Sequence, residues 1–170
     1  MKVVNVVASG DLHQTVDLNR LSGIGEEFIF DPKKYHGGYL SLHGGKATIY
    51  RSGKYILYGM KSTNCLSGIW DEFYSFLSSY LDMSVAAFPV IQNVVGMTEI
   101  HRKISLTKVC AVFSLEYVEY EPEVFPGLIW RMEKGTCIIF SSGKILVMGV
   151  KSVDQLNLVE VYIRSRLAQL

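Results

Sequence analysis

The sequence predicts an α+β fold in which two related halves form one pseudosymmetric domain, with antiparallel strands covered by helices on one face. Two observations lead to this prediction. The 170-residue chain carries one pattern twice, and each copy places a strand and a short helix before three strands and a longer helix. Hydrophobic residues make up 49% of the chain and charged residues only 19%, so a sizeable core can form.

The internal repeat covers most of the chain. Residues 31–62 align without a gap on residues 121–152, at an offset of 90, with ten identities in 32 positions. Upstream, Asn5-Val6-Val7 matches Asn93-Val94-Val95 at an offset of 88. Two copies with so long a period indicate a duplicated domain and not a solenoid. We place the repeats at residues 1–86 and 87–170.

The elements of the first copy follow from its apolar pattern and its glycines. Strands are expected at about 3–8, 39–43, 46–51 and 54–60, with glycine turns between the last three. A short helix is expected near 17–24, where Asp17 can serve as N-cap, and a longer one at 64–81. The second copy repeats this order, with strands at 90–95, 128–133, 136–141 and 144–150 and helices at 105–112 and 153–167.

Charge and cysteine content restrict the classes of function. A net charge of +1 is too small for a protein that holds DNA by charge alone. Cys65, Cys110 and Cys137 lack paired spacing, which favours reduced, buried thiols in an intracellular protein over a disulfide framework or a zinc site. No apolar run is long enough for a membrane helix, and Asn5 interrupts the apolar N-terminal stretch, so no signal peptide is expected.

The strands at 54–60 and 144–150 are apolar at both alternating sets of positions. Either both faces of the sheet are buried, as in a sandwich, or one apolar face is left open for a ligand. The turn-like segments DPKKYHGG (31–38) and EPEVFPGL (121–128) favour the second interpretation. Each carries a ring, Tyr35 or Phe125, at a place where turns are normally polar and where core packing does not explain it.

Several motifs resemble the TATA-box-binding protein family: YEPEVFPGLIWRM (120–132), IIFSSGKILVMGVKS (138–152) and VIQNVVG (90–96). VVNVVAS, FDPKKYHGG and TIYRSGKYILYGMKS resemble the family's first half, so the resemblance covers essentially the whole chain. It implies a saddle, a curved ten-stranded antiparallel sheet with four helices on the convex face. It also implies a general transcription initiation factor that binds and bends A·T-rich TATA-box promoter DNA, with no catalysis and no cofactor or metal.

The resemblance assigns residues to the DNA minor groove. The family inserts two phenylalanine pairs between base steps at the ends of its site; the matching intercalating positions are Tyr35, Tyr50, Phe125 and Phe140. Groove contacts are implied for Asn5, Val7, Thr48, Ile56, Tyr58, Asn93, Val95, Ile138, Leu146 and Met148. Asn5 and Asn93 match the family's central pair, whose amides can donate to acceptors shared by A·T and T·A. A purely structural role is the alternative for an asparagine inside an apolar strand.

The implied contacts to the DNA backbone involve Lys34, Ser52, Lys54, Arg131, Ser142 and Lys144, for which ordinary solvated turn chemistry is the alternative. Glu121, Glu123 and Val124 match the acidic loop through which the family docks a transcription factor B protein and, indirectly, RNA polymerase. Such a protein acts with the genome, in the nucleus of a eukaryote or in the cytoplasm and nucleoid of an archaeon. It involves no membrane, and dimerisation of the DNA-free protein stays open.

The chain also departs from the family. Tyr35 and Tyr50 replace phenylalanines, so each of these intercalating rings carries a hydroxyl. Tyr58 and Met148 replace threonines, and Ser41 replaces an arginine. We therefore expect weaker or less A·T-selective binding, dominated by the second half. The alternative is a divergent paralogue that acts as a regulatory protein-interaction module with weak or altered DNA binding. An enzyme is disfavoured, because the four histidines form no triad or metal pair.

Overall fold

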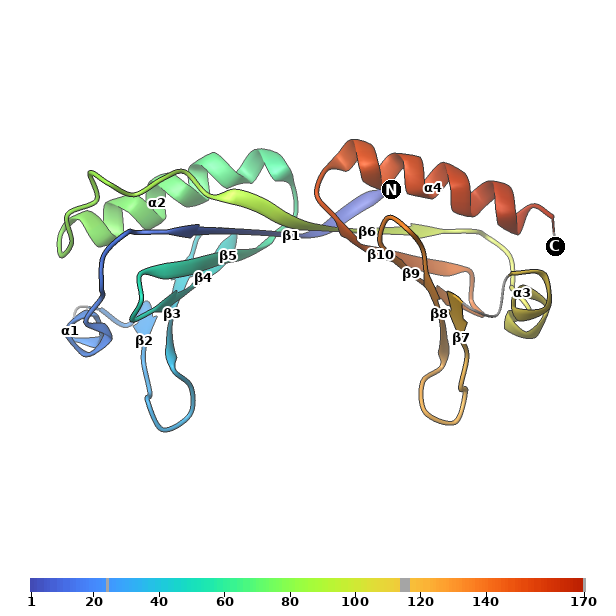
Figure 1. Cartoon of the computed structure of the whole chain (residues 1–170), viewed down its shortest axis with the longest axis horizontal. Coiled ribbons are helices and arrows are strands. Elements are labelled where there is room, and N and C mark those ends of the chain that lie inside the picture. Colours follow the sequence, from blue (N-terminus) through green and yellow to red (C-terminus); the bar gives the residue numbers. More distant parts are fainter. Residues whose placement is uncertain (24, 114–116, 170) are drawn as a thin grey trace. The chain divides into compact units, whose positions relative to one another are not determined.

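The computed structural model describes residues 1–23, 25–113 and 117–169. These residues form ten strands and four α-helices, and the strands pair antiparallel within each unit, which confirms the predicted α+β class (Figure 1). By its contacts the chain forms two compact units. We call Asn5–Gln92 the N-terminal unit, and Asn93–Leu170 together with Met1–Val4 the C-terminal unit. The repeat boundary at 86/87 stays a prediction.

Five strands of the N-terminal unit lie side by side in the order β2 (Phe28–Ile29), β3 (Gly37–Leu42), β4 (Gly45–Tyr50), β5 (Lys54–Met60) and β1 (Lys2–Asp11). Its helices are α1 (Leu18–Ser22) and α2 (Leu66–Ser78), the latter preceded by a 3₁₀ turn at Thr63–Cys65. The helix predicted near 17–24 is shorter than expected, and Ile24 lies outside the described residues. Asp17 is its N-cap as predicted, since Oδ1 accepts from the backbone N–H of Asn19 at 3.0 Å.

The C-terminal unit repeats this arrangement with strands in the order β6 (Val90–Glu99), β10 (Lys144–Val150), β9 (Thr136–Phe140), β8 (Gly127–Arg131) and β7 (Val118–Glu119). Its helices are α3 (Leu106–Val112) and α4 (Val153–Leu167). The bounds of α4 and β10 are those expected from the sequence. The two-residue edge strands β2 and β7 had no place among the predicted segments.

Each unit buries the strand face on which its long helix packs. In the N-terminal unit Tyr55 and Leu57 of β5 are buried, and Ile69 of α2 lies 3.2 Å from where a Cβ on Gly45 would be. In the C-terminal unit Ile145 and Val147 of β10 are fully buried, and Leu156 of α4 packs directly on Gly96 of β6. The core of each unit therefore lies between its sheet and its long helix.

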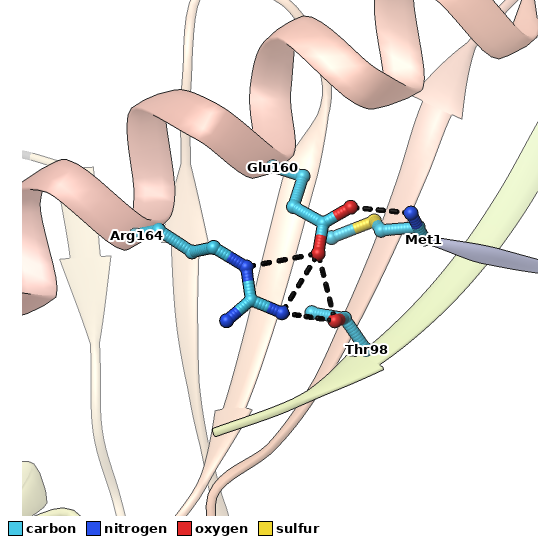
Figure 2. Close-up of polar contacts among 4 residues, drawn as sticks. All are labelled: Met1, Thr98, Glu160 and Arg164. Carbon is cyan, nitrogen blue, oxygen red and sulfur yellow. Dashed lines mark hydrogen bonds and ion pairs between the residues drawn. The ribbon is translucent and has the colours of Figure 1, made fainter.

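One half-buried polar cluster joins the amino terminus to β6 and α4 within the C-terminal unit (Figure 2). Glu160 accepts hydrogen bonds from the Thr98 hydroxyl at 2.8 Å and the Arg164 guanidinium at 2.8 Å, and forms an ion pair with the amino group of Met1. Burial alone would raise the pKa of Glu160. The three donors outweigh burial and hold that pKa at about 2, so the carboxylate stays charged.

The cysteines are free, but the expectation that all are buried holds only for Cys137, because Cys65 is exposed and Cys110 is half-buried. Cys137 is buried in β9, and burial raises the pKa of its thiol to about 12, which suppresses its reactivity. Among the described helices, none is long and apolar enough to cross a membrane.

Candidate nucleic-acid interface

Each unit has a second strand face, opposite the helices, that we call its open face. In the N-terminal unit it carries Asn5 and Val7 of β1, Ile56 and Tyr58 of β5, Thr48 and Tyr50 of β4, and Tyr39 of β3. In the C-terminal unit it carries Val95 and Met97 of β6, Leu146 and Met148 of β10, Ile138 and Phe140 of β9, and Ile129 of β8. Most of these side chains are half-buried or exposed, while their neighbours along each strand are fully buried. The interpretation with one apolar face left open therefore fits each unit.

Two of the predicted intercalating rings, Tyr35 and Phe125, are carried by the loops before β3 and β8, and the other two, Tyr50 and Phe140, end β4 and β9. Figure 1 shows the two loops. Both loops use the same turn. The carbonyl of Asp31 accepts from the N–H groups of Lys34 and Tyr35 at 3.0 Å, and Glu121 accepts from Val124 and Phe125 at 2.9 Å. Tyr35 and Phe125 are therefore held in equivalent places, and neither ring is buried in its unit's core.

Each loop ring contacts a ring from the neighbouring strand. Phe125 and Phe140 meet edge to face, with centroids 6.0 Å apart, and Tyr35 and Tyr50 do the same at 6.3 Å. Both pairs lie over a glycine. A Cβ at Gly127 would stand 2.7 Å from the Phe125 ring and 3.1 Å from the Phe140 ring, and one at Gly37 would stand 3.0 and 3.1 Å from the two tyrosine rings. The repeated glycine is needed because the rings occupy the space of its side chain.

The tyrosine pair differs from the phenylalanine pair in one bond. The hydroxyls of Tyr35 and Tyr50 hydrogen-bond to each other at 2.9 Å. This bond, with burial, raises the pKa of Tyr50 to about 12. His36 stacks on the Tyr50 ring at 5.4 Å between centroids and contacts the Tyr35 ring at a tilt, at 4.4 Å. The two hydroxyls that replace apolar ring edges thus satisfy each other within the unit.

Asn5 and Asn93 each hold a β-bulge. The β1–β5 register shifts between Val6 and Ala8, and there Asn5 Oδ1 accepts from the N–H of Gly59 at 2.9 Å. In the C-terminal unit Asn93 Oδ1 accepts from Gly149 at 2.8 Å. Both glycines have a φ near +86°, at +87° and +85°, which an L side chain rarely adopts. The structural alternative therefore holds for the oxygens, while the amide NH₂ groups have no hydrogen bond to other described residues.

Thr48 is the least accessible of the predicted groove residues, at 5% exposed. Its γ-methyl lies 3.0 Å from the place of a Cβ on Gly37, between the tyrosine pair and β5. Val7, Ile56, Tyr58, Val95, Ile138, Leu146 and Met148 are half-buried on the open faces. Tyr39 at 42% and Met97 at 40% are more exposed than any of these, yet sequence reasoning missed both. Their alternation with buried residues could have indicated them.

The predicted backbone contacts are all exposed, but several already have partners. Ser52 and Ser142 accept from the N–H groups of Lys54 and Lys144 at 3.4 Å, which is turn chemistry. Lys34 pairs with Asp31 at 3.5 Å. Arg131 donates to both carboxylate oxygens of Glu119, at 2.9 and 3.2 Å, and this pairing lowers the pKa of Glu119.

Acidic residues stand beside both turn lysines, a feature that sequence reasoning also missed. Asp11 is the cross-strand partner of Lys54, and Glu99 is the partner of Lys144. The two acids match at the offset of 88 that relates the asparagines, which was the available signal. In the N-terminal unit Asp11, Lys54, Tyr50 and His36 line a groove of about 790 Å³ at the open face.

The loop predicted to dock a transcription factor B protein is exposed. Glu121, Glu123 and Val124 lie on the turn that carries Phe125, and the Val124 side chain is 79% exposed. Among the described residues, no group of three or more His, Cys, Asp or Glu is arranged to hold a metal ion.

Comparison with known proteins gives one consistent result. The family model "Transcription factor TFIID (or TATA-binding protein, TBP)" matches the chain twice, at residues 1–80 and 88–170. TATA-box-binding protein C of Halobacterium salinarum is 32% identical, covering 100% of this chain and 98% of that protein. The TATA-box-binding protein of Sulfolobus acidocaldarius is 36% identical over 92% of this chain and 81% of its own length. The solved structure of Methanococcus jannaschii TBP superposes with a TM-score of 0.79 at 26% identity, covering 99% of this chain and 98% of that one.

Proposed function

Because the chain belongs to the TATA-binding protein family, a family of non-enzymatic DNA-binding transcription factors with two repeats, we propose that it is a general transcription initiation factor that binds and bends A·T-rich promoter DNA through the minor groove. The observation that carries this proposal is the open face of each unit. It is apolar, it lies opposite the helices, and it ends in a ring pair over a glycine.

The physical argument rests on burial. Opening a base step opposes binding by a few kcal/mol, and the bent duplex then contacts more protein surface. Apolar side chains against sugar and base edges stabilise the complex by roughly 25 cal/mol for each Å² buried. A protein with a net charge of +1 can bind DNA in this way, with Lys54 and Lys144 assisting at phosphates. The Asn5 and Asn93 amides keep their NH₂ groups for the acceptors of A·T pairs.

The same proposal names the partners. Glu121, Glu123 and Val124 would dock a transcription factor B protein, which in turn recruits RNA polymerase, and the protein would act where the genome is. The exposure of this loop supports the assignment. Arg131 and Lys34 would have to exchange their carboxylate partners for phosphates, so they contribute less than Lys54 and Lys144.

The alternative is a regulatory protein-interaction module that engages DNA weakly. The nearly buried Thr48 and the bidentate Arg131–Glu119 pair favour it, because both remove groups that the family resemblance assigns to DNA.

A titration across salt concentration tests the two functions. Wild-type protein is titrated with A·T-rich and with G·C-rich duplexes, beside Phe125→Ala and Phe140→Ala. Phe88→Ala is the matched control, since Phe88 is 54% exposed but meets Trp70 of α2 edge to face, on the helix side. We expect an A·T preference that both ring variants weaken and the control keeps. Unchanged affinity in the ring variants would favour the protein-interaction module.

A further inference from the structure

The two open faces differ in their tyrosine content. At four equivalent positions the N-terminal unit has Tyr35, Tyr39, Tyr50 and Tyr58, whereas the C-terminal unit has Phe125, Ile129, Phe140 and Met148. All eight residues belong to the open faces or their ring pairs. One unit therefore presents four hydroxyls where the other presents none.

Two of these hydroxyls are available to a ligand. The hydroxyls of Tyr35 and Tyr50 hydrogen-bond to each other. The hydroxyls of Tyr39 and Tyr58 make no hydrogen bond to any other described residue. Tyr39 is 42% exposed and is the cross-strand partner of Thr48, which in turn pairs with Ile56 of β5. Tyr58 lies two residues beyond Ile56 on the same face of β5. A tyrosine hydroxyl can both donate one hydrogen bond and accept others. The equivalent residues Ile129 and Met148 offer only apolar contact.

The DNA minor groove distinguishes these two surfaces. An A·T or T·A pair presents only acceptors there, whereas a G·C pair adds the guanine N2 amino donor. Against Ile129 and Met148 that donor would be buried without a partner, which strongly opposes binding. Against Tyr39 and Tyr58 it would find a hydroxyl oxygen. The same hydroxyls can donate to the acceptors of A·T, so the tyrosine surface accepts both kinds of pair.

We propose that the N-terminal unit tolerates G·C pairs in its half of the DNA site, while the C-terminal unit requires A·T. Tyr39 and Tyr58 are the specificity-determining residues. This inference rests on the proposed function, in which each repeat covers one half-site. Its consequence is orientation: a site with G·C in one half is bound with the N-terminal unit over that half.

A palindromic A·T duplex allows the test without knowing the bound orientation, because either unit can occupy either half. G·C pairs are introduced in one half or in both, at each step along the half-site. With G·C in one half, the protein can still bind with its N-terminal unit over that half. Affinity should therefore fall only because one of the two equivalent orientations is lost. With G·C in both halves, it should fall about tenfold, as the C-terminal unit then meets an unpaired donor. Inosine·C, which lacks the N2 amino group, should restore binding.

The variant Tyr39→Phe/Tyr58→Phe removes the hydroxyls alone, and Tyr74→Phe on α2 is the control. In the double variant, G·C in one half should already weaken binding about tenfold relative to the same variant's binding of the all-A·T duplex, with the thermal midpoint little changed. If G·C pairs in either half lowered the affinity of the wild-type protein by the same factor, and G·C in both halves lowered it by the product of the two factors, the proposal would be overturned. It would also be overturned if the double variant responded to G·C pairs as the wild-type protein does. Failure to prefer the A·T duplex at all would overturn the proposed function as well, so the two failures are distinguishable.

Discussion

Replacing Gly127 by alanine should weaken DNA binding without unfolding the protein. The backbone at Gly127 is not among those with positive φ, so alanine is acceptable to the main chain. The new methyl would lie 2.7 Å from Phe125 Cε1, 2.9 Å from Ile138 Cγ2 and 3.1 Å from Phe140 Cε1. To reach ordinary contact at 3.4 Å, the Phe125 ring must retreat by about 0.7 Å, and the other two groups must move as well.

The ring pair is half-exposed, so most of this displacement should appear in the rings and little in the core. Overpacking of this kind opposes folding by about 1–3 kcal/mol, and we expect the lower end here. A displaced ring fills an opened base step poorly, so affinity for the A·T duplex should fall about tenfold, which corresponds to about 1.4 kcal/mol. The bend measured by fluorescence energy transfer between the duplex ends should decrease.

Gly68→Ala is the matched control, because a Cβ there meets no atom within 4 Å and Gly68 lies in α2. It should raise stability by up to about 1 kcal/mol and leave DNA binding unchanged. If Gly127→Ala bound and bent the duplex like wild type, the rings would not be the inserting groups, and the argument from their packing would be wrong.

Three further expectations concern the Glu160 cluster, a bulge asparagine and the acids beside the turn lysines. The pKa of Glu160 is about 2 in the folded protein against an ordinary 4.5, so the charged carboxylate stabilises the fold by up to about 3 kcal/mol. This stabilisation is complete above pH 4.5 and is lost as pH falls towards 2. Acid unfolding of Glu160→Gln should lack this component. Asn93→Asp keeps the oxygen that Gly149 needs but removes the NH₂ group, so it should retain the thermal midpoint and lose DNA affinity, whereas Asn93→Ala should lower both. Asp11→Asn with Glu99→Gln should raise DNA affinity several-fold at low salt and less at high salt, and an unchanged affinity would place these acids away from the phosphates.

The repeat and most elements could be predicted because glycines mark their ends. β10 and α4 begin and end where the pattern indicated, since the turn at Gly143 and the Ser152 cap bound them. The strands β2 and β7 could not be found this way, because two residues carry no alternation. The exposure of Cys65 was missed because the residue lies in a 3₁₀ turn before α2, where helical spacing does not apply.

The positions of the candidate site's residues could be predicted from the sequence, but the hydrogen bonds that these residues make could not. The ring positions follow from the repeated turn, and the asparagines from their repeated motif. That Asn5 supports a bulge depends on a register shift between β1 and β5, and a register shift leaves no mark on either strand's own pattern. That the Tyr35 and Tyr50 hydroxyls pair depends on two ring orientations, which the sequence does not specify.

These differences separate what the duplication kept from what it changed. Both units keep the backbone features: the turn under the loop ring, the glycine beneath the ring pair, and the asparagine that holds the bulge. Each of them fixes main-chain geometry, so its loss would displace every side chain around it. The side chains on the open faces carry no such constraint: tyrosines match phenylalanines in the ring pairs, and Tyr39 and Tyr58 stand where the other unit has Ile129 and Met148. The units therefore differ chemically in side chains carried on the same backbone features, and that is where a difference in base preference between the two halves would arise.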